Sequence, residues 1–227
     1  MRIPTYLSPE DRARVSDAVS QAEQKTVGEI VTILAERSDG YTDVALAWAA
    51  FVTFLALTAL AIAPDFYLGI YEWLVGGWVQ EWTPRGIFTL AAVVAALKFG
   101  GMLLIQLWQP LKFFLIPGPV RTNRVHERAV RAFRIGAERR THGRTGILIY
   151  LSMREHRAEI VADESIATKV DPEVWGDAME AMLAELKQGR TADGMIAAVE
   201  RVGAILAEHF PIEEGDTNEL PDRLIEV

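Results

Sequence analysis

The sequence predicts an α/β domain with a small central sheet flanked by helices, and a two-helix transmembrane hairpin that interrupts it. Two observations predict this fold class. A block dominated by Ala, Leu, Val, Phe and Trp runs from Val44 to Trp108, and the charged residues concentrate on both sides of it. The flanks together have roughly 160 residues, which is enough to bury a hydrophobic core. The chain therefore divides into an N-terminal part of the domain at 1–42, an insert at 43–117, a C-terminal part at 118–211 and an acidic, disordered tail at 212–227.

The first part of the domain is expected to form one helix and one strand. Ser8 is a favourable N-cap, Pro9 occupies the first helical position, and acidic residues follow in the first turn. The helix should run to about Gln24. The segment from Gly28 to Ala35 is rich in β-branched residues, which predicts a buried strand.

The second part of the domain is expected to contain a β-hairpin and three helices. The hairpin strands are 146–152 and 156–162, joined by a polar turn, and the helices cover 122–141, 171–187 and 191–209. A single strand is not stable in water, so the strand before the insert must join this hairpin. The insert therefore splits one domain.

Two spans are predicted within the insert, at about 44–63 and 86–108. The first span is twenty residues without a charge, and as a helix it covers about 30 Å, the thickness of a hydrocarbon core. The second span carries Lys98 near its middle. Lys98 is either a functional charge that contacts a partner, or a long side chain that reaches toward the lipid headgroups.

The segment between the spans predicts the orientation of the protein. Residues 66–84 contain several Tyr and Trp residues, which favour the headgroup layer, so an interfacial loop is expected. Arg85 is the only basic residue near this segment, whereas Lys and Arg are frequent in both flanks. The positive-inside rule places both termini in the cytoplasm of a multi-pass protein of the inner (plasma) membrane.

Composition excludes several classes of function. The chain has no cysteine, which excludes disulfides, thiolate catalysis and thiolate metal sites. Its formal net charge of −8 argues against nucleic acid as a partner, because binding to phosphate backbones depends on clustered Lys and Arg.

One basic cluster nevertheless stands out on the helix that follows the insert. Four arginines share a face of this helix and could contact anionic lipid or a partner, at about 1 kcal/mol each near a membrane surface. The alternative is a solvated face that contributes only to topology. These residues are Arg121, Arg124, Arg128 and Arg131.

Several motifs resemble the TPM domain family, which is named for a thylakoid lumen protein, a photosystem II repair factor and a worm receptor modulator. The resemblance covers both flanks but not the transmembrane insert. It lies in Ala22-Glu23, Thr26-x-Gly28-Glu29-Ile30-Val31, Ser38-Asp39-x-Tyr41, Thr145-Gly146-Ile147-Leu148-Ile149-Tyr150-Leu151-Ser152, Glu159-Ile160-Val161-Ala162-Asp163-x-x-Ile166 and His209-Phe210-Pro211.

The resemblance implies an α/β sandwich-like domain and a possible carboxylate site. Some members of the family are described as acid phosphatases or calcium binders, and others act in the assembly or repair of membrane complexes. Asp39 and Asp163 match the acidic positions of the family and could converge on a divalent cation such as calcium, with Glu164 as a further ligand. Alternatively, both aspartates cap turns or helices by accepting backbone hydrogen bonds.

Two functions are compatible with these features. The first is a non-catalytic assembly, repair or accessory factor whose partners are the lipid bilayer and other membrane protein subunits. The second is a metal-assisted phosphatase that uses the carboxylate site. No catalytic residue is predicted, because the sequence contains no recognisable combination of nucleophile, base and phosphate-binding cation.

Overall fold

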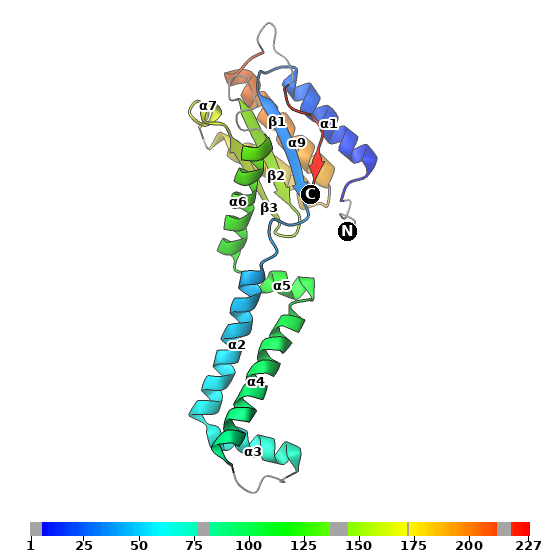
Figure 1. Ribbon diagram of the computed structural model, residues 1–227. Helices are drawn as coiled ribbons and strands as arrows, with labels where there is room; N and C mark the ends of the chain where they lie inside the picture. The colour runs from blue at the N-terminus through cyan, green and yellow to red at the C-terminus, as the bar shows by residue number, and fades with distance from the viewer. Residues whose placement is uncertain (1–5, 77–81, 137–144, 172, 213–218) are drawn as a thin grey trace. The chain divides into compact units, whose positions relative to one another are not determined.

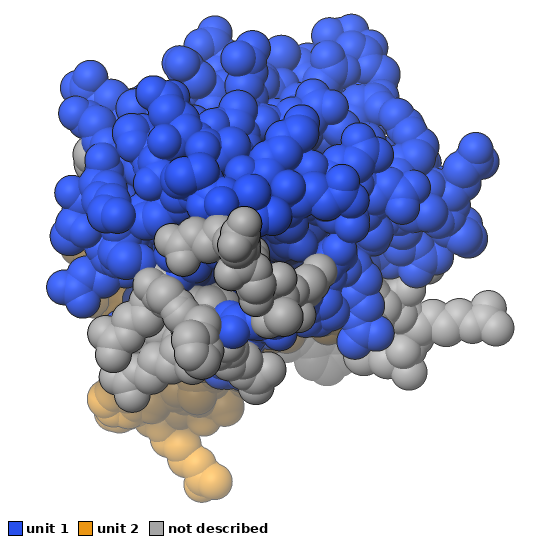
Figure 2. Space-filling view, turned by 90° about the horizontal axis from the view of Figure 1, so that it is seen from above, with its two compact units in different colours: residues 1–39, 118–227 blue, residues 40–117 orange. Residues whose placement is uncertain are grey.

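A computed structural model describes residues 6–76, 82–136, 145–171, 173–212 and 219–227 (Figure 1). The chain forms two compact units, which are blue and orange in Figure 2. The first unit combines Met1–Asp39 with Gly118–Val227, and the second is Gly40–Pro117.

A mixed four-stranded sheet organises the first unit, with the strand order β3-β2-β1-β4. The strands are β1 (Glu29–Ala35), β2 (Gly146–Ser152), β3 (Arg157–Ala162) and β4 (Ile225–Glu226). Strand β1 pairs in parallel with both β2 and β4, and β2 pairs with β3 as the expected antiparallel hairpin. The β1–β2 pair joins chain segments from both sides of the insert.

Helices cover both faces of this sheet (Figure 1). One face carries α1 (Pro9–Glu23), α7 (Glu164–Ala167), α8 (Val174–Leu186) and α9 (Thr191–His209). The other face carries α6 (Gly118–Gly136). The mixed α/β fold class predicted from the sequence is therefore confirmed.

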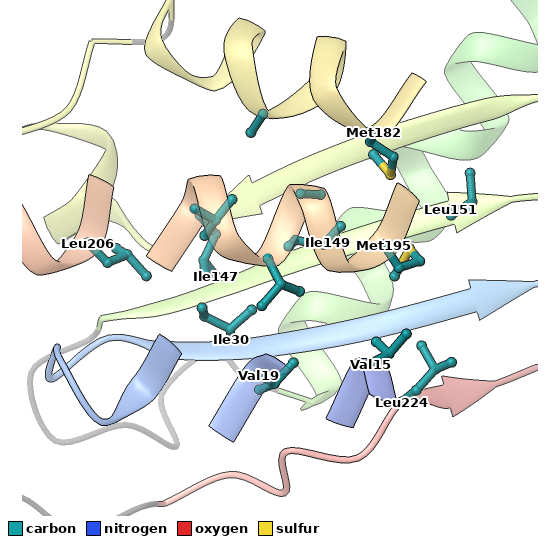
Figure 3. Packing of buried hydrophobic residues seen from close by; sticks show 14 of the residues in the cluster. Val15, Val19, Ile30, Ile147, Ile149, Leu151, Met182, Met195, Leu206 and Leu224 are labelled. Carbon is teal, nitrogen blue, oxygen red and sulfur yellow. The ribbon is translucent and has the colours of Figure 1, made fainter. Parts of the chain in front are cut away.

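Alternation along β1 and β2 produces two hydrophobic cores. In the larger core, Ile30 and Ile147 from the strands contact Val19 of α1 and Met195 of α9 (Figure 3). The intervening strand residues face α6 instead, because successive side chains of a strand point to opposite faces. They pack with Phe133 and form the smaller core. Every residue of β1 and β2 is buried, as expected for parallel strands covered on both faces.

Local signals explain how α1 begins and how closely it packs. Ser8 is the N-cap of α1, and its Oγ accepts a hydrogen bond of 3.0 Å from the Asp11 amide. Gly203 permits α9 to approach α1, because a Cβ at this position would lie 2.6 Å from the Cβ of Ala22. The predicted bounds of both helices agree with the structure to within one residue.

The second unit contains α2 (Thr42–Ile62), α3 (Pro64–Val75), α4 (Pro84–Ile105) and α5 (Gln109–Leu115). Helices α2 and α4 pack against each other as a hairpin. By length and composition, both are long and apolar enough to cross a membrane. The second expected span, 86–108, is shorter in the structure because the helix ends at Ile105.

The expected interfacial loop between the spans is wrong for residues 66–75, which belong to helix α3. Pro64 at the first helical position and Asp65 in the first turn both favour a helix start. Gly76 ends α3 with a left-handed φ of 76°. The part of the loop at residues 77–81 lies outside the described residues.

The expectation of a disordered tail is also wrong for residues 219–227. Leu220 and Leu224 are buried, and β4 adds to the sheet edge at Ile33 of β1. The tail is acidic overall, but it also contains apolar residues that can be buried against this sheet edge. Residues 213–218, which belong to the same predicted tail, lie outside the described residues.

Candidate functional site

A polar cleft of about 250 Å³ lies where residues that follow β1 meet one face of α6. We call it the arginine cleft. Its α6 residues have the spacing i, i+3, i+4 and i+7, so they share one helix face. Ligands of open α/β sheets bind outside the carboxyl ends of parallel strands, which is where β1 ends. The lining residues are Ser38, Asp39, Arg124, Glu127, Arg128 and Arg131.

Carboxylates neutralise one of the three arginines in the cleft. Arg124 forms salt bridges with Asp39 at 3.1 Å and with Glu127 at 3.6 Å. Within the described parts of the chain, Arg128 and Arg131 form no salt bridge with a carboxylate. The cleft therefore has an excess of positive charge on the side of these two arginines.

A buried hydrogen-bond network supports the cleft from beneath. The hydroxyl of Tyr150 on β2 lies 3.1 Å from the Oγ of Ser38. Glu155 is fully buried and accepts hydrogen bonds from the Ser38 amide, at 3.0 Å, and from the Ser152 hydroxyl. Burial raises the pKa of Tyr150 above its ordinary value, although Ser38 and Arg128 act in the opposite direction. Tyr150 is therefore neutral at physiological pH and fixes the position of Ser38.

Sequence reasoning missed Tyr150 and Glu155. Tyr150 lies in a predicted strand and in one of the TPM-like motifs, where its hydroxyl is given no role, yet a buried tyrosine hydroxyl normally has a hydrogen-bond partner. Glu155 was assigned to a polar turn. The signal that could have found Glu155 is its place three residues after the end of a strand with both faces buried, where a carboxylate can reach back to Ser152 and Ser38.

The structure does not bring the predicted carboxylate site together. Asp39 follows the carboxyl end of β1, whereas Asp163 lies beside Gly146 at the amino end of β2. A seven-residue strand separates the two ends by about 20 Å. The antiparallel β2–β3 pair is the reason, because the residue after β3 must lie where β2 begins. The expected convergence of these aspartates is therefore wrong.

Of the predicted ligands, Asp163 accepts a backbone hydrogen bond, as in the alternative role, whereas Asp39 forms a salt bridge with an arginine. The Asp163 Oδ2 accepts a hydrogen bond of 3.2 Å from the Gly146 amide, and Asp39 pairs with Arg124. Glu164 is exposed and begins α7. Across the described ranges, no group of three or more His, Asp or Glu residues is placed to hold a metal ion such as calcium.

The predicted contact residues divide between several places. Arg124, Arg128 and Arg131 line the arginine cleft. Arg121 is half-buried and is not among the lining residues. Lys98 is exposed on α4 in the second unit.

A second polar cluster fastens the C-terminal segment to the amino end of β1. The Glu29 carboxylate accepts hydrogen bonds from the Glu219 and Leu220 amides at 3.0 and 3.1 Å. Glu23 accepts one of 2.7 Å from the Ile30 amide. Burial, with smaller contributions from the neighbouring Glu29 and Asp222 carboxylates, raises the pKa of Glu23 to about 8. Glu23 is therefore protonated over much of the neutral range.

Comparison with known proteins supports the predicted resemblance. Residues 120–205, which span α6, the β2–β3 hairpin, α7, α8 and most of α9, match the family model of the TPM domain. No curated protein matches the chain. The NMR structure of the BA42 protein from the psychrophilic bacterium Bizionia argentinensis has a TM-score of 0.57 and 18% identity, and the match covers 100% of this chain and 99% of that chain. This likeness shows the fold, and residues 120–205 are similar to the TPM domain.

Proposed function

We propose that this protein is an integral membrane accessory factor, in which α2 and α4 cross the bilayer and the TPM domain binds other subunits of a membrane complex without catalysis. The observation that carries this proposal is the exposed surface of the hairpin. Large apolar side chains such as Phe54, Phe88 and Leu104 are between 67% and 75% exposed. In water such a surface would be a liability, whereas in lipid it is the stable arrangement.

The distribution of charge supports a hairpin with both termini in the cytoplasm. Basic residues are frequent before α2 and after α4, whereas the segment between these helices has none and only Arg85, in the first turn of α4, lies near it. Helix α3 carries exposed Phe66, Tyr67 and Trp73, which suit the headgroup layer on the opposite side. We therefore assign the protein to the inner membrane as a multi-pass protein.

The arrangement of polar groups supports a role in binding rather than in catalysis. Asp39 and Asp163 lie at opposite ends of the sheet, so they cannot activate one water molecule together. A phosphatase mechanism based on this pair has no geometric support. The resemblance to TPM proteins that assemble or repair membrane complexes makes an accessory role the better proposal.

Absence of cysteine permits a direct test of the topology. Gly69 on α3 and Gly176 on α8 are exposed glycines where an added Cβ meets nothing within 4 Å. In intact bacterial cells, a membrane-impermeant maleimide should label G69C and should label G176C only after the cells are opened. Labelling of G176C in intact cells would contradict the cytoplasmic orientation. Extraction of either variant by alkaline carbonate would contradict membrane insertion.

Gentle purification tests the accessory role. Full-length protein solubilised in mild detergent should carry a stoichiometric membrane protein partner, which mass spectrometry can identify. A chain that always purifies alone contradicts the role. Hydrolysis of a chromogenic phosphate that Asp39→Asn or Asp163→Asn abolishes would instead favour the phosphatase.

A further inference from the structure

We propose that the arginine cleft binds the phosphate of an anionic phospholipid headgroup. The inference rests on the proposed membrane insertion of α2 and α4, and it adds a specific lipid site to the TPM domain. The charge of the cleft, its hydrogen-bond donors and its position in the chain all favour such a site.

The charge of the cleft favours an anion. Asp39 and Glu127 are both engaged with Arg124, so they do not neutralise the remaining arginines. Arg128 and Arg131 are exposed side chains on the same face of α6. A long cationic side chain without a carboxylate partner offers its full charge to a ligand. Three arginines and two carboxylates leave the cleft lining with a net charge of +1, which matches the single negative charge of a phosphodiester.

The donors of the cleft favour phosphate among anions. A guanidinium presents its N–H groups as a planar fork that binds two phosphate oxygens at once. Ser38 adds a hydroxyl to the lining. Its position is fixed by Tyr150 and by the hydrogen bond that its own backbone N–H donates to Glu155. The volume of about 250 Å³ holds a phosphate group together with several waters, each of which occupies about 30 Å³.

The position of the cleft in the chain identifies the source of the phosphate. Only Gly40 and Tyr41 separate Asp39 from Thr42, the first residue of α2. At up to about 3.6 Å per residue, this link reaches at most about 11 Å. If α2 begins at the membrane surface, a lipid headgroup is the phosphate within reach of that link.

The test uses the full chain in lipid nanodiscs made of phosphatidylcholine with a minor share of phosphatidylglycerol. After release into mild detergent, native mass spectrometry counts the lipids that the protein retains. Wild type should retain one phosphatidylglycerol, and the R128Q/R131Q variant should retain at least about tenfold less. The R128K/R131K variant keeps both charges without the planar fork and should fall between them.

The matched control is K187Q/R201Q, which removes two exposed charges from α8's end and α9, on the other face of the sheet. It should retain lipid like wild type. Equal retention by R128Q/R131Q, or equal retention of phosphatidylcholine and phosphatidylglycerol by wild type, overturns the inference. Circular dichroism establishes that each variant is folded.

Two further outcomes separate the inference from its premise. A chain that does not enter nanodiscs overturns both the membrane insertion and the lipid site. Alternatively, wild type could enter nanodiscs, retain no lipid and bind inorganic phosphate in a manner that depends on Arg128 and Arg131. This result would overturn the lipid headgroup as the source of the bound phosphate, and it would leave the membrane insertion intact.

Discussion

The two ends of the β1–β2 strand pair handle charge in opposite ways. At the carboxyl end, Glu155 is buried beneath the cleft, but the charged side chains that line the cleft are partly exposed, and Arg124 pairs with Asp39. At the amino end, buried carboxylates accept hydrogen bonds from backbone amides, as Glu29 and Asp163 do. The first arrangement leaves arginines available to a ligand, and the second fixes the chain. We expect substitutions at the amino end to alter stability and substitutions at the carboxyl end to alter binding.

The largest expected effect concerns the C-terminal segment that the amino-end carboxylates hold. Leu224 is 8% exposed in the larger core, so Leu224→Ala should lower the free energy of unfolding by about 2–5 kcal/mol. Thermal unfolding of the detergent-solubilised chain measures this. Ile212→Ala, at a residue that is 54% exposed, is the control and should change little. Equal melting temperatures of L224A and wild type would show that the segment does not contribute to the fold.

The second effect is a dependence of stability on pH. The pKa of Glu23 is raised in the folded state to about 8, so the folded state binds a proton that the unfolded state loses near pH 4.5. Stability should therefore be complete below about pH 4.5 and should fall as pH rises toward 8. The slope should reach about 1.4 kcal/mol per pH unit.

Chemical unfolding at a series of pH values between 5 and 8 measures this slope. Glu23→Gln should flatten it, because the amide mimics the protonated acid. Glu200→Gln is a matched control on the exposed face of α9 and should leave the slope unchanged. A wild-type slope near zero would contradict the assignment of the proton to Glu23.

A third effect compares the two aspartates directly. Asp163 is 6% exposed and its carboxylate accepts the Gly146 amide, so Asp163→Ala should cost about 1.5–3 kcal/mol. Hydrogen exchange of the Gly146 amide should accelerate in the same variant. A loss of stability without faster exchange at Gly146 would assign the effect to another contact.

The smallest effect is expected at the carboxyl end. The Asp39 and Arg124 side chains are 36% and 35% exposed, and ion pairs of this kind contribute at most about 1 kcal/mol. Asp39→Ala should therefore leave the melting temperature almost unchanged at high salt. If D39A destabilises the chain as much as D163A, the two ends of the strand pair do not differ as proposed.

The fold was largely predictable because its signals are local. Ser8-Pro9 predicted the start of α1, and the β-branched run from Gly28 predicted β1. The β2–β3 hairpin followed from two apolar runs around a polar turn. In each case the sequence pattern and the tertiary environment favour the same element.

The features that the sequence did not predict depend on contacts between residues that are distant in the sequence. Leu224 is buried because β1 offers an open edge, and nothing near residue 224 in the sequence indicates that edge. Likewise, the separation of Asp39 from Asp163 depends on the strand order, which an isolated hairpin does not reveal. The arginine face of α6 was visible in the sequence, but Ser38 as the opposite wall of the cleft was not.

The parallel pairing of β1 with β2 has a consequence for synthesis. The Val27 carbonyl and the Thr145 hydroxyl, bonded at 3.0 Å, are 118 residues apart. At a translation rate of about 5–20 residues per second, β2 is synthesised about 6–24 s after β1. Within the insert, the Lys112 Nζ donates a hydrogen bond to the Gly40 carbonyl, 72 residues away in the sequence. This contact holds the first and last parts of the insert close together. The hairpin thus shortens the effective loop between the strands, which lowers the entropic cost of pairing β1 with β2.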